Sequence, residues 1–147
     1  MHHRLSEQEV NHAVIEVDNL DLAYPPPRRQ GLAEVNLRVM WRNYRALGYH
    51  RLIYTNTLSV LHRSALAAAI EGTVNVTGVL LTARDEVVRQ RLSVRKLGSA
   101  LETHLQRSQD RAAELEARGP VWTHRLSTDD KSVAEIAGEV LDLIDWA

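Results

Sequence analysis

Four short segments of the chain have the apolar, β-branched composition of buried strands. The first, AVIEVD, runs directly into polar positions, and the second, RLIYTNTL, is rich in β-branched and aromatic residues. The other two are TVNVTGVLLTA and VWTHRL, which are bounded by glycine and proline. We therefore predict strands over residues 13–18, 51–58, 73–83 and 121–126.

Between these segments, apolar positions recur at steps of three and four residues, which is the spacing of amphipathic helices. The clearest apolar face belongs to the C-terminal segment, where Ser132 and Glu135 also have the spacing of a capping box. An earlier helix is expected to end before Gly48, because glycine is favoured just after a helix. The predicted helices cover residues 32–47, 60–71, 85–95, 99–118 and 133–144.

Strands that alternate with helices indicate an α/β fold with a parallel sheet and right-handed crossovers. The length of 147 residues suits one domain with a substantial core. We therefore expect a single domain over residues 1–147, built as a three-layer sandwich around a parallel sheet of about four strands.

The amino-acid composition narrows the range of possible functions. The formal net charge is −1, so nothing indicates a nucleic-acid partner, and the absence of cysteine excludes disulfides and thiolate chemistry. No apolar run approaches the roughly 20 residues of a membrane helix, and the N-terminus lacks the apolar core of a signal peptide. We therefore expect a cytoplasmic protein without a membrane partner. The seven histidines have no metal-ligand spacing, so no metal site on protein ligands is expected.

Polar residues follow the predicted strands. Asp18 and Asn19 end the first, Asn56 ends the second, and Thr128 follows the fourth. In open parallel sheets, ligands bind beyond the carboxyl ends of the strands, so these side chains are candidate ligand contacts. The alternative for Asp18 is that its carboxylate caps the turn that follows.

Arginines gather on the helix after the third strand. Arg91 and Arg95 are four residues apart and share a helical face. Guanidinium groups offer fork-shaped donors, so this pair could clamp a phosphate. The alternative is a solvated helical face on which these arginines pair with Asp85 and Glu86.

The order and spacing of these motifs resemble the small-molecule kinases of the P-loop superfamily, in particular the relatives of adenylylsulfate kinase and gluconate kinase. The resemblance extends from about Leu5 to Ile144. It depends on five stretches: VIEVDNL, EVNLRVMWRNYRALG, TLSVLHRSAL, VLLTARDEVVRQRLSVRKLG and RLSTDDKSVAEIAGEVLDLI.

The resemblance implies ATP-dependent phosphoryl transfer to a small hydroxyl-bearing molecule, with ATP and Mg²⁺ as cofactors. Asp18 would face the acceptor, and Arg91 and Arg95, in a lid over about residues 91–112, would neutralise the transferring phosphate. The implied substrate contacts are Asn19, Arg38, Asn56 and Arg63, and Thr128 would lie near the adenine base. For Arg38 and Arg63, ordinary surface pairing is the alternative.

One departure from this family matters for activity. The family opens with a strand and the loop G-x-x-x-x-G-K-[ST], and this chain contains no such motif. Residues 4–11 resemble only the end of the helix that follows that loop. The true gene start would then lie upstream, or the chain is a fragment, or the loop was lost. We expect no turnover and no cofactor without the loop; the alternative function is a non-catalytic remnant that binds a partner protein or a nucleotide weakly.

The same departure affects the sheet. In the family, the absent strand lies in the middle of the sheet, between the strands predicted here over 51–58 and 74–83. Its loss would leave two apolar strand edges unpaired. Either 51–58 pairs directly with 74–83, or the sheet recruits a strand from another chain. Self-association through these edges is therefore a further hypothesis.

Overall fold

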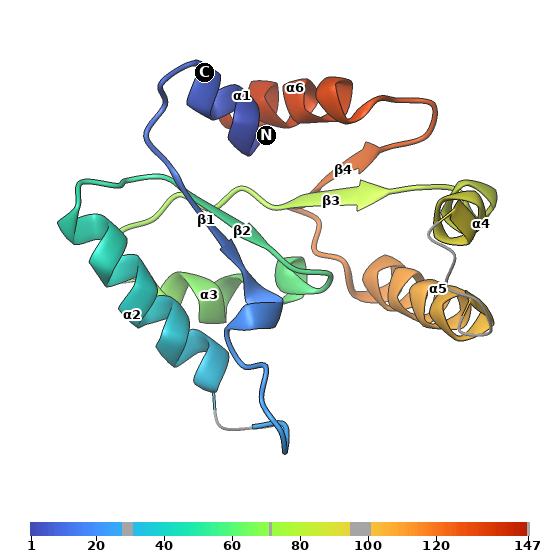
Figure 1. The fold of residues 1–147 in the computed structure, drawn as a ribbon, viewed down its shortest axis with the longest axis horizontal. Coiled ribbons are helices and arrows are strands. Elements are labelled where there is room, and N and C mark those ends of the chain that lie inside the picture. Colours follow the sequence, from blue (N-terminus) through green and yellow to red (C-terminus); the bar gives the residue numbers. More distant parts are fainter. Residues whose placement is uncertain (28–30, 71, 95–100, 147) are drawn as a thin grey trace.

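The chain folds as an α/β protein in a computed structural model that describes residues 1–27, 31–70, 72–94 and 101–146. Six α-helices and four short parallel strands are formed within these described ranges (Figure 1). In chain order the elements are α1 (His2–Glu7), β1 (Ala13–Glu16), the 3₁₀ turn η1 (Val17–Asn19), α2 (Leu32–Ala46), β2 (Leu52–Thr55), the 3₁₀ turn η2 (Ser59–His62), α3 (Arg63–Ala69), β3 (Val79–Thr82), α4 (Asp85–Val94), α5 (Leu101–Arg118), β4 (His124–Ser127) and α6 (Val133–Ile144).

The strands form two separate sheets. β1 pairs with β2 in parallel, with Ala13 opposite Leu52, and β3 pairs with β4 in parallel, with Val79 opposite His124. The prediction of one sheet of about four strands is therefore wrong, and β2 does not pair directly with β3. Helix α3, which connects the two sheets, packs Ala69 against the β1–β2 layer, and among the described residues β3 pairs with β4 alone.

The observed strands are shorter than the segments that the sequence pattern predicted as strands. The first ends at Glu16, where the backbone turns into η1, and the fourth begins at His124 instead of residue 121. In the third segment, Val74 and Val76 are half-buried between exposed neighbours, but their backbone joins no ladder. Alternation along a sequence reports which side chains face inward, whereas a strand also needs a neighbour to pair with. The predicted helix 60–71 divides into η2 and α3.

One hydrophobic cluster holds β1, β2, α2 and α3 together. Ile15, Leu20, Leu37 and Ala69 are buried at its centre, and Leu52 and Tyr54 of β2 pack against them. The alternation of β1 explains this arrangement, because Ala13 and Ile15 are buried while Val14 and Glu16 are exposed. The helical spacing of α2 likewise buries Leu37 and Trp41.

The C-terminal helix was predicted correctly. The Ser132 hydroxyl accepts the backbone N–H of Glu135, and the Glu135 carboxylate accepts the backbone N–H of Ser132, which completes the expected capping box. The Arg4 guanidinium of α1 donates to the carbonyl of Ala134 in α6. Figure 1 shows α1 and α6 together on one side of the strands, with α2 and α3 on the other. None of the helices in the described part of the chain is both long and apolar enough to cross a membrane.

Candidate functional site

Two groups of polar side chains occupy the carboxyl ends of the two sheets. At the first, Asp18 lies in η1 directly after β1, and Asn56 directly follows β2. The Asn56 amide donates to Asp18 Oδ1 over 3.5 Å, and its oxygen accepts the backbone N–H of Leu58 at 2.9 Å. The bond to Leu58 fixes the orientation of the Asn56 amide, so its N–H₂ group is directed at the carboxylate. Asp18 is exposed and therefore accessible to a ligand.

A second carboxylate was missed in the sequence. Glu16 is the last residue of β1, and its carboxylate accepts the hydroxyl of Thr55 at 2.5 Å from the position opposite in the ladder. It lies two residues before Asp18, so both acidic groups belong to the same end of β1. The period-two alternation of the strand was the available signal, because it already placed Glu16 on the exposed face.

At the second sheet, the structure brings Arg91 and Thr128 together. The two terminal nitrogens of Arg91 donate to the hydroxyl and to the backbone carbonyl of Thr128, both at 2.8 Å. The hydroxyl in turn donates to the carbonyl of Thr82 at 3.0 Å. Thr128 is only 7% exposed, so this network connects α4 to the ends of β3 and β4 and holds one side of the arginine in place.

The turn after β4 also anchors the start of α4. The carboxylate of Asp129 accepts the backbone N–H of Arg84 at 3.0 Å and the Ser127 hydroxyl at 3.1 Å. The backbone hydrogen bond from Arg84 is the largest cause that lowers the pKa of Asp129, and the Ser127 hydroxyl contributes in the same direction. Asp129 therefore remains a carboxylate, and its hydrogen bonds join the turn after β4 to the start of α4.

The arginines of this region differ in the charge of their partners. Arg84 forms ion pairs with Asp129 and Asp130, and Arg89 pairs with Glu102. Arg91 instead donates to two uncharged oxygens of Thr128. Its charge also acts on Asp129, whose pKa it helps to lower, but its hydrogen bonds to Thr128 leave further N–H donors for an anion.

The other predicted site residues are dispersed. Asn19 is exposed at the end of η1, and Arg38 lies on α2, where it lines a small pocket of about 120 Å³ with Trp41. Arg63 stands over the ring of Trp122, with its guanidinium carbon 4.7 Å from the ring centroid. Arg95 and the adjoining part of the expected lid lie outside the described residues.

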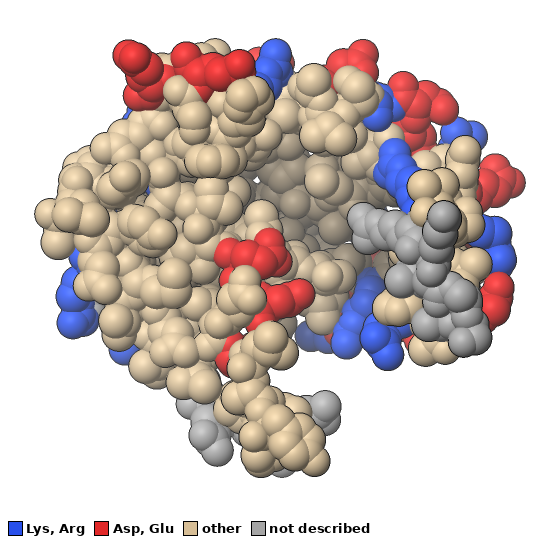
Figure 2. All heavy atoms as spheres, viewed as in Figure 1, with Lys and Arg blue, Asp and Glu red and all other residues tan. Residues whose placement is uncertain are grey.

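Figure 2 shows a hollow at the centre of the molecule. Acidic side chains lie on its near left side, where Figure 1 shows the end of β1, and basic side chains lie on its right, toward α4 and α5. Side chains of both signs therefore lie near this hollow.

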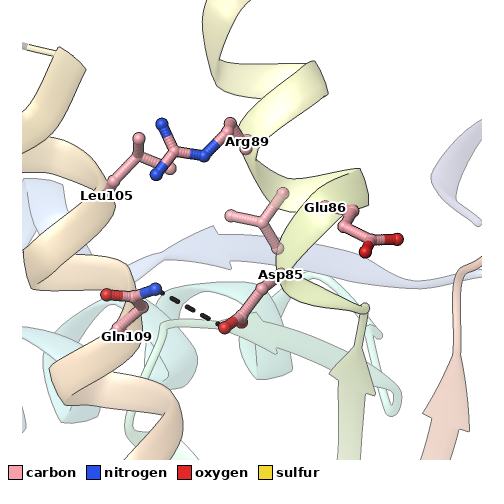
Figure 3. Close-up of a pocket in the computed structure, with 6 residues that line it drawn as sticks. Asp85, Glu86, Arg89, Leu105 and Gln109 are labelled. Atoms are coloured by element: carbon pink, nitrogen blue, oxygen red, sulfur yellow. Dashed lines mark hydrogen bonds between the residues drawn. The ribbon is translucent and has the colours of Figure 1, made fainter.

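A separate pocket lies between α4 and α5. It measures about 140 Å³ and is lined by Val88 and Leu105 together with polar groups. Figure 3 shows the Gln109 amide directed at Asp85, to which it donates over 3.4 Å. Ligand pockets for drug-sized molecules have about 300–1,000 Å³, so this one is too small for a nucleotide.

The donor set of the described chain does not fit Mg²⁺ bound to a triphosphate. Nowhere in the described ranges do three or more His, Cys, Asp or Glu side chains gather as metal ligands, and the sequence has no glycine–lysine phosphate loop. Comparisons with protein-family models, with curated proteins and with solved structures gave no match.

Proposed function

We propose that the protein is a P-loop kinase-like body that binds a phosphate-bearing small molecule at the carboxyl ends of its strands. In this proposal, Asp18 and Asn56 meet the acceptor side of the ligand and Arg91 meets its phosphate. The chain alone, without a phosphate loop, does not turn over ATP. Phosphoryl transfer depends mainly on positioning and on charge stabilisation, and the loop supplies the largest share of both.

The observation that supports this proposal best is the place where the sheet divides. The division separates the β1–β2 pair from the β3–β4 pair. This is the position at which the resemblance to the P-loop kinases leaves a strand unfilled. An unrelated four-stranded α/β fold would have no reason to interrupt its ladder at that point, because direct pairing of β2 and β3 would satisfy two more backbone edges.

The chemistry follows from the groups at the two strand ends. A carboxylate such as Asp18 accepts a hydrogen bond from a hydroxyl, and the Asn56 amide limits how it can turn. A guanidinium held on one side by Thr128 keeps further N–H donors for phosphate oxygens. Arg63, which stacks on Trp122, contributes nothing to these steps in its present position.

A titration with pyrophosphate tests the proposal. Pyrophosphate without metal is added to ¹⁵N-labelled protein, and we expect shifts at Arg91 and Thr128 with a Kd of about 1 mM. Arg91→Gln should weaken binding at least about fivefold, which is the effect of one charge-assisted hydrogen bond. The matched control is Arg89→Gln on the same helix, because Arg89 already pairs with Glu102; it should leave binding unchanged. Equal effects of the two substitutions, or no binding at 10-fold higher concentration, would contradict the proposal.

A second candidate function is protein interaction without catalysis. It is favoured by the outer edges of β2 and β3, which have no ladder partner among the described residues. An unpaired edge is a template for a strand from another polypeptide. The pyrophosphate titration separates the two functions, since an interaction module gives no anion binding that depends on Arg91.

A further inference from the structure

Three arginines form a stripe along the exposed side of α2. Arg38, Arg42 and Arg45 follow one another at steps of four and three residues, so their side chains lie on neighbouring turns of the helix. Trp41 lies between them in the sequence and is only 6% exposed. These four side chains line a pocket of about 120 Å³, which we call the arginine pocket.

The charge of the arginine pocket is not cancelled by carboxylates at its two ends. Among the residues that the structure describes, neither Arg38 nor Arg45 forms an ion pair. Arg45 donates to Nδ1 of His50, which must be the acceptor because a guanidinium has donors only. Glu34 is the one acidic residue of α2, and it pairs with neither arginine. Both guanidinium groups therefore keep their charge for an anion.

The arginine pocket lies away from the carboxyl ends of the strands. Helix α2 connects two parallel strands and therefore runs opposite to them, which brings its last turn to the start of β2. The contact of Arg45 with His50, two residues before β2, confirms this placement. Figure 2 shows basic side chains, and no acidic ones, at the lower left edge of the molecule, where Figure 1 shows α2. The pocket is therefore distinct from the groups around Asp18 and Asn56.

The size and charge of the arginine pocket select a small anionic group. A water molecule takes up about 30 Å³ in the liquid, and pockets for drug-sized ligands have about 300–1,000 Å³, so this pocket admits one group and not a nucleotide. A phosphate monoester carries a charge of about −1.5 to −2 and three terminal oxygens. A carboxylate carries a single charge on two oxygens. Three guanidinium groups therefore match a phosphate better than a carboxylate.

The surface beside the arginine pocket is apolar. Val35 and Val39 precede Arg38 and Arg42 by three residues each, so each valine neighbours one arginine on the helix. Both valines are 50% exposed. A ligand with its phosphate in the pocket would lay its next atoms on these side chains, and an apolar ligand would gain free energy by covering them.

We propose that the arginine pocket binds the phosphate group of a monoester whose remaining part is apolar. The phosphate lies among the three arginines, and the apolar part lies on Val35 and Val39. Two sources offer this chemistry: a soluble aryl or alkyl phosphate, and a phospholipid with a monoester headgroup. The site does not depend on Arg91, which belongs to α4 beside the other sheet.

Phenyl phosphate is the soluble probe, and phenylacetate, which has the same ring but a single carboxylate, is its control. Each is added without metal to ¹⁵N-labelled full-length chain, and the indole N–H signal of Trp41 reports binding. We expect a Kd of about 1 mM for phenyl phosphate and at least about tenfold weaker binding of phenylacetate. Phenyl phosphate should also bind more weakly below pH of about 6, because its phosphate then loses one charge.

Substitutions separate the pocket from the overall charge of the chain. Arg38→Gln removes a guanidinium that makes no described hydrogen bond, and glutamine suits a helix about as well as arginine, so the variant should fold. It should weaken phenyl phosphate at least about fivefold, and Arg38→Lys, which keeps the charge but loses the fork, should weaken it less. The matched control is Arg111→Gln on α5, because Arg111 already pairs with Glu114. Equal effects of Arg38→Gln and Arg111→Gln would overturn the proposal.

Vesicles distinguish the two sources of the phosphate. The chain is sedimented with phosphatidylcholine vesicles that contain phosphatidic acid, and vesicles of phosphatidylcholine alone are the control. Sedimentation that Arg38→Gln abolishes assigns the group to a lipid headgroup, and saturable binding of phenyl phosphate without sedimentation assigns it to a soluble molecule; both outcomes support the site. The absence of both would overturn it. Arg91→Gln should leave the Trp41 titration unchanged, so this site and the one at the strand ends succeed or fail separately.

Discussion

The substitution of Gly78 by alanine tests how the two sheets are joined. Gly78 is buried just before β3, and the ring of Trp122 covers its Cα. An added Cβ would come within 2.2 Å of Cζ3 and 2.9 Å of Cη2 of that ring. Carbon atoms pack best at about 3.5–4.0 Å, so the ring would have to move by more than about 1 Å.

Overpacking of a buried site costs about 1–3 kcal/mol. Movement of Trp122 would also weaken its contact with the Arg63 guanidinium, which contributes about 0.5–1 kcal/mol at a partly exposed site. We therefore expect Gly78→Ala to lower the free energy of unfolding by about 2–3 kcal/mol, equivalent to roughly 5–10 °C in Tm for a chain of this size.

Urea unfolding followed by tryptophan fluorescence measures the change. Gly138→Ala is the matched control, because the added Cβ in α6 would meet only the end of the flexible Arg4 side chain at 2.6 Å. Alanine is also favoured over glycine inside a helix by about 1 kcal/mol, so this control should be neutral or stabilising.

A double-mutant cycle shows whether Trp122 is the cause. In a Trp122→Leu background, the smaller side chain leaves room for the Cβ, and Gly78→Ala should cost less than about 1 kcal/mol. The reasoning is refuted if Gly78→Ala costs under 0.5 kcal/mol in the natural chain, or if its cost is the same in both backgrounds.

Three further predictions concern single groups. Ser132→Ala removes the oxygen that accepts the Glu135 N–H and should cost about 1 kcal/mol in urea titrations, whereas Ser132→Asp, which keeps a capping oxygen, should cost little. Burial, together with two nearby carboxylates, raises the pKa of Tyr54 to about 12. Its contribution is fully present below the unfolded pKa of about 10 and is lost as pH rises toward 12, so Tyr54→Phe should flatten that part of a pH–stability curve. Thr128→Val removes the hydroxyl that holds Arg91, and should cost about 1–3 kcal/mol in thermal unfolding.

Local features of the fold could be predicted from the sequence. The capping box at Ser132 depends on two residues three positions apart, and the buried face of α6 depends on helical spacing. The position of Asp18 beside Asn56 followed from the rule that parallel strands end at the same edge. Each of these inferences needs only the pattern of one segment, or a general property of parallel sheets.

The remaining features depend on contacts between distant segments. The pattern of residues 73–83 indicates a strand, but only Val79–Thr82 finds a partner, because pairing is a property of two segments. Arg63 was expected on the substrate side, and the ring of Trp122 offers it a cation–π contact instead. The hydrogen bonds between Arg91 and Thr128 join residues that are 37 positions apart, and the spacing of residues within one helix or strand cannot predict such a contact.

Amide hydrogen exchange of the free protein, followed residue by residue by NMR, tests the central claim that β2 and β3 belong to separate sheets. The N–H groups of Ile53 and Leu80 belong to the two ladders and should exchange slowly. Those of Leu52, Tyr54, Val79 and Leu81 face away from the partner strands and should exchange at least about tenfold faster, in an alternating pattern along both strands. Slow exchange at every position of β2 and β3 would mean that the two edges are already paired, and would contradict the account.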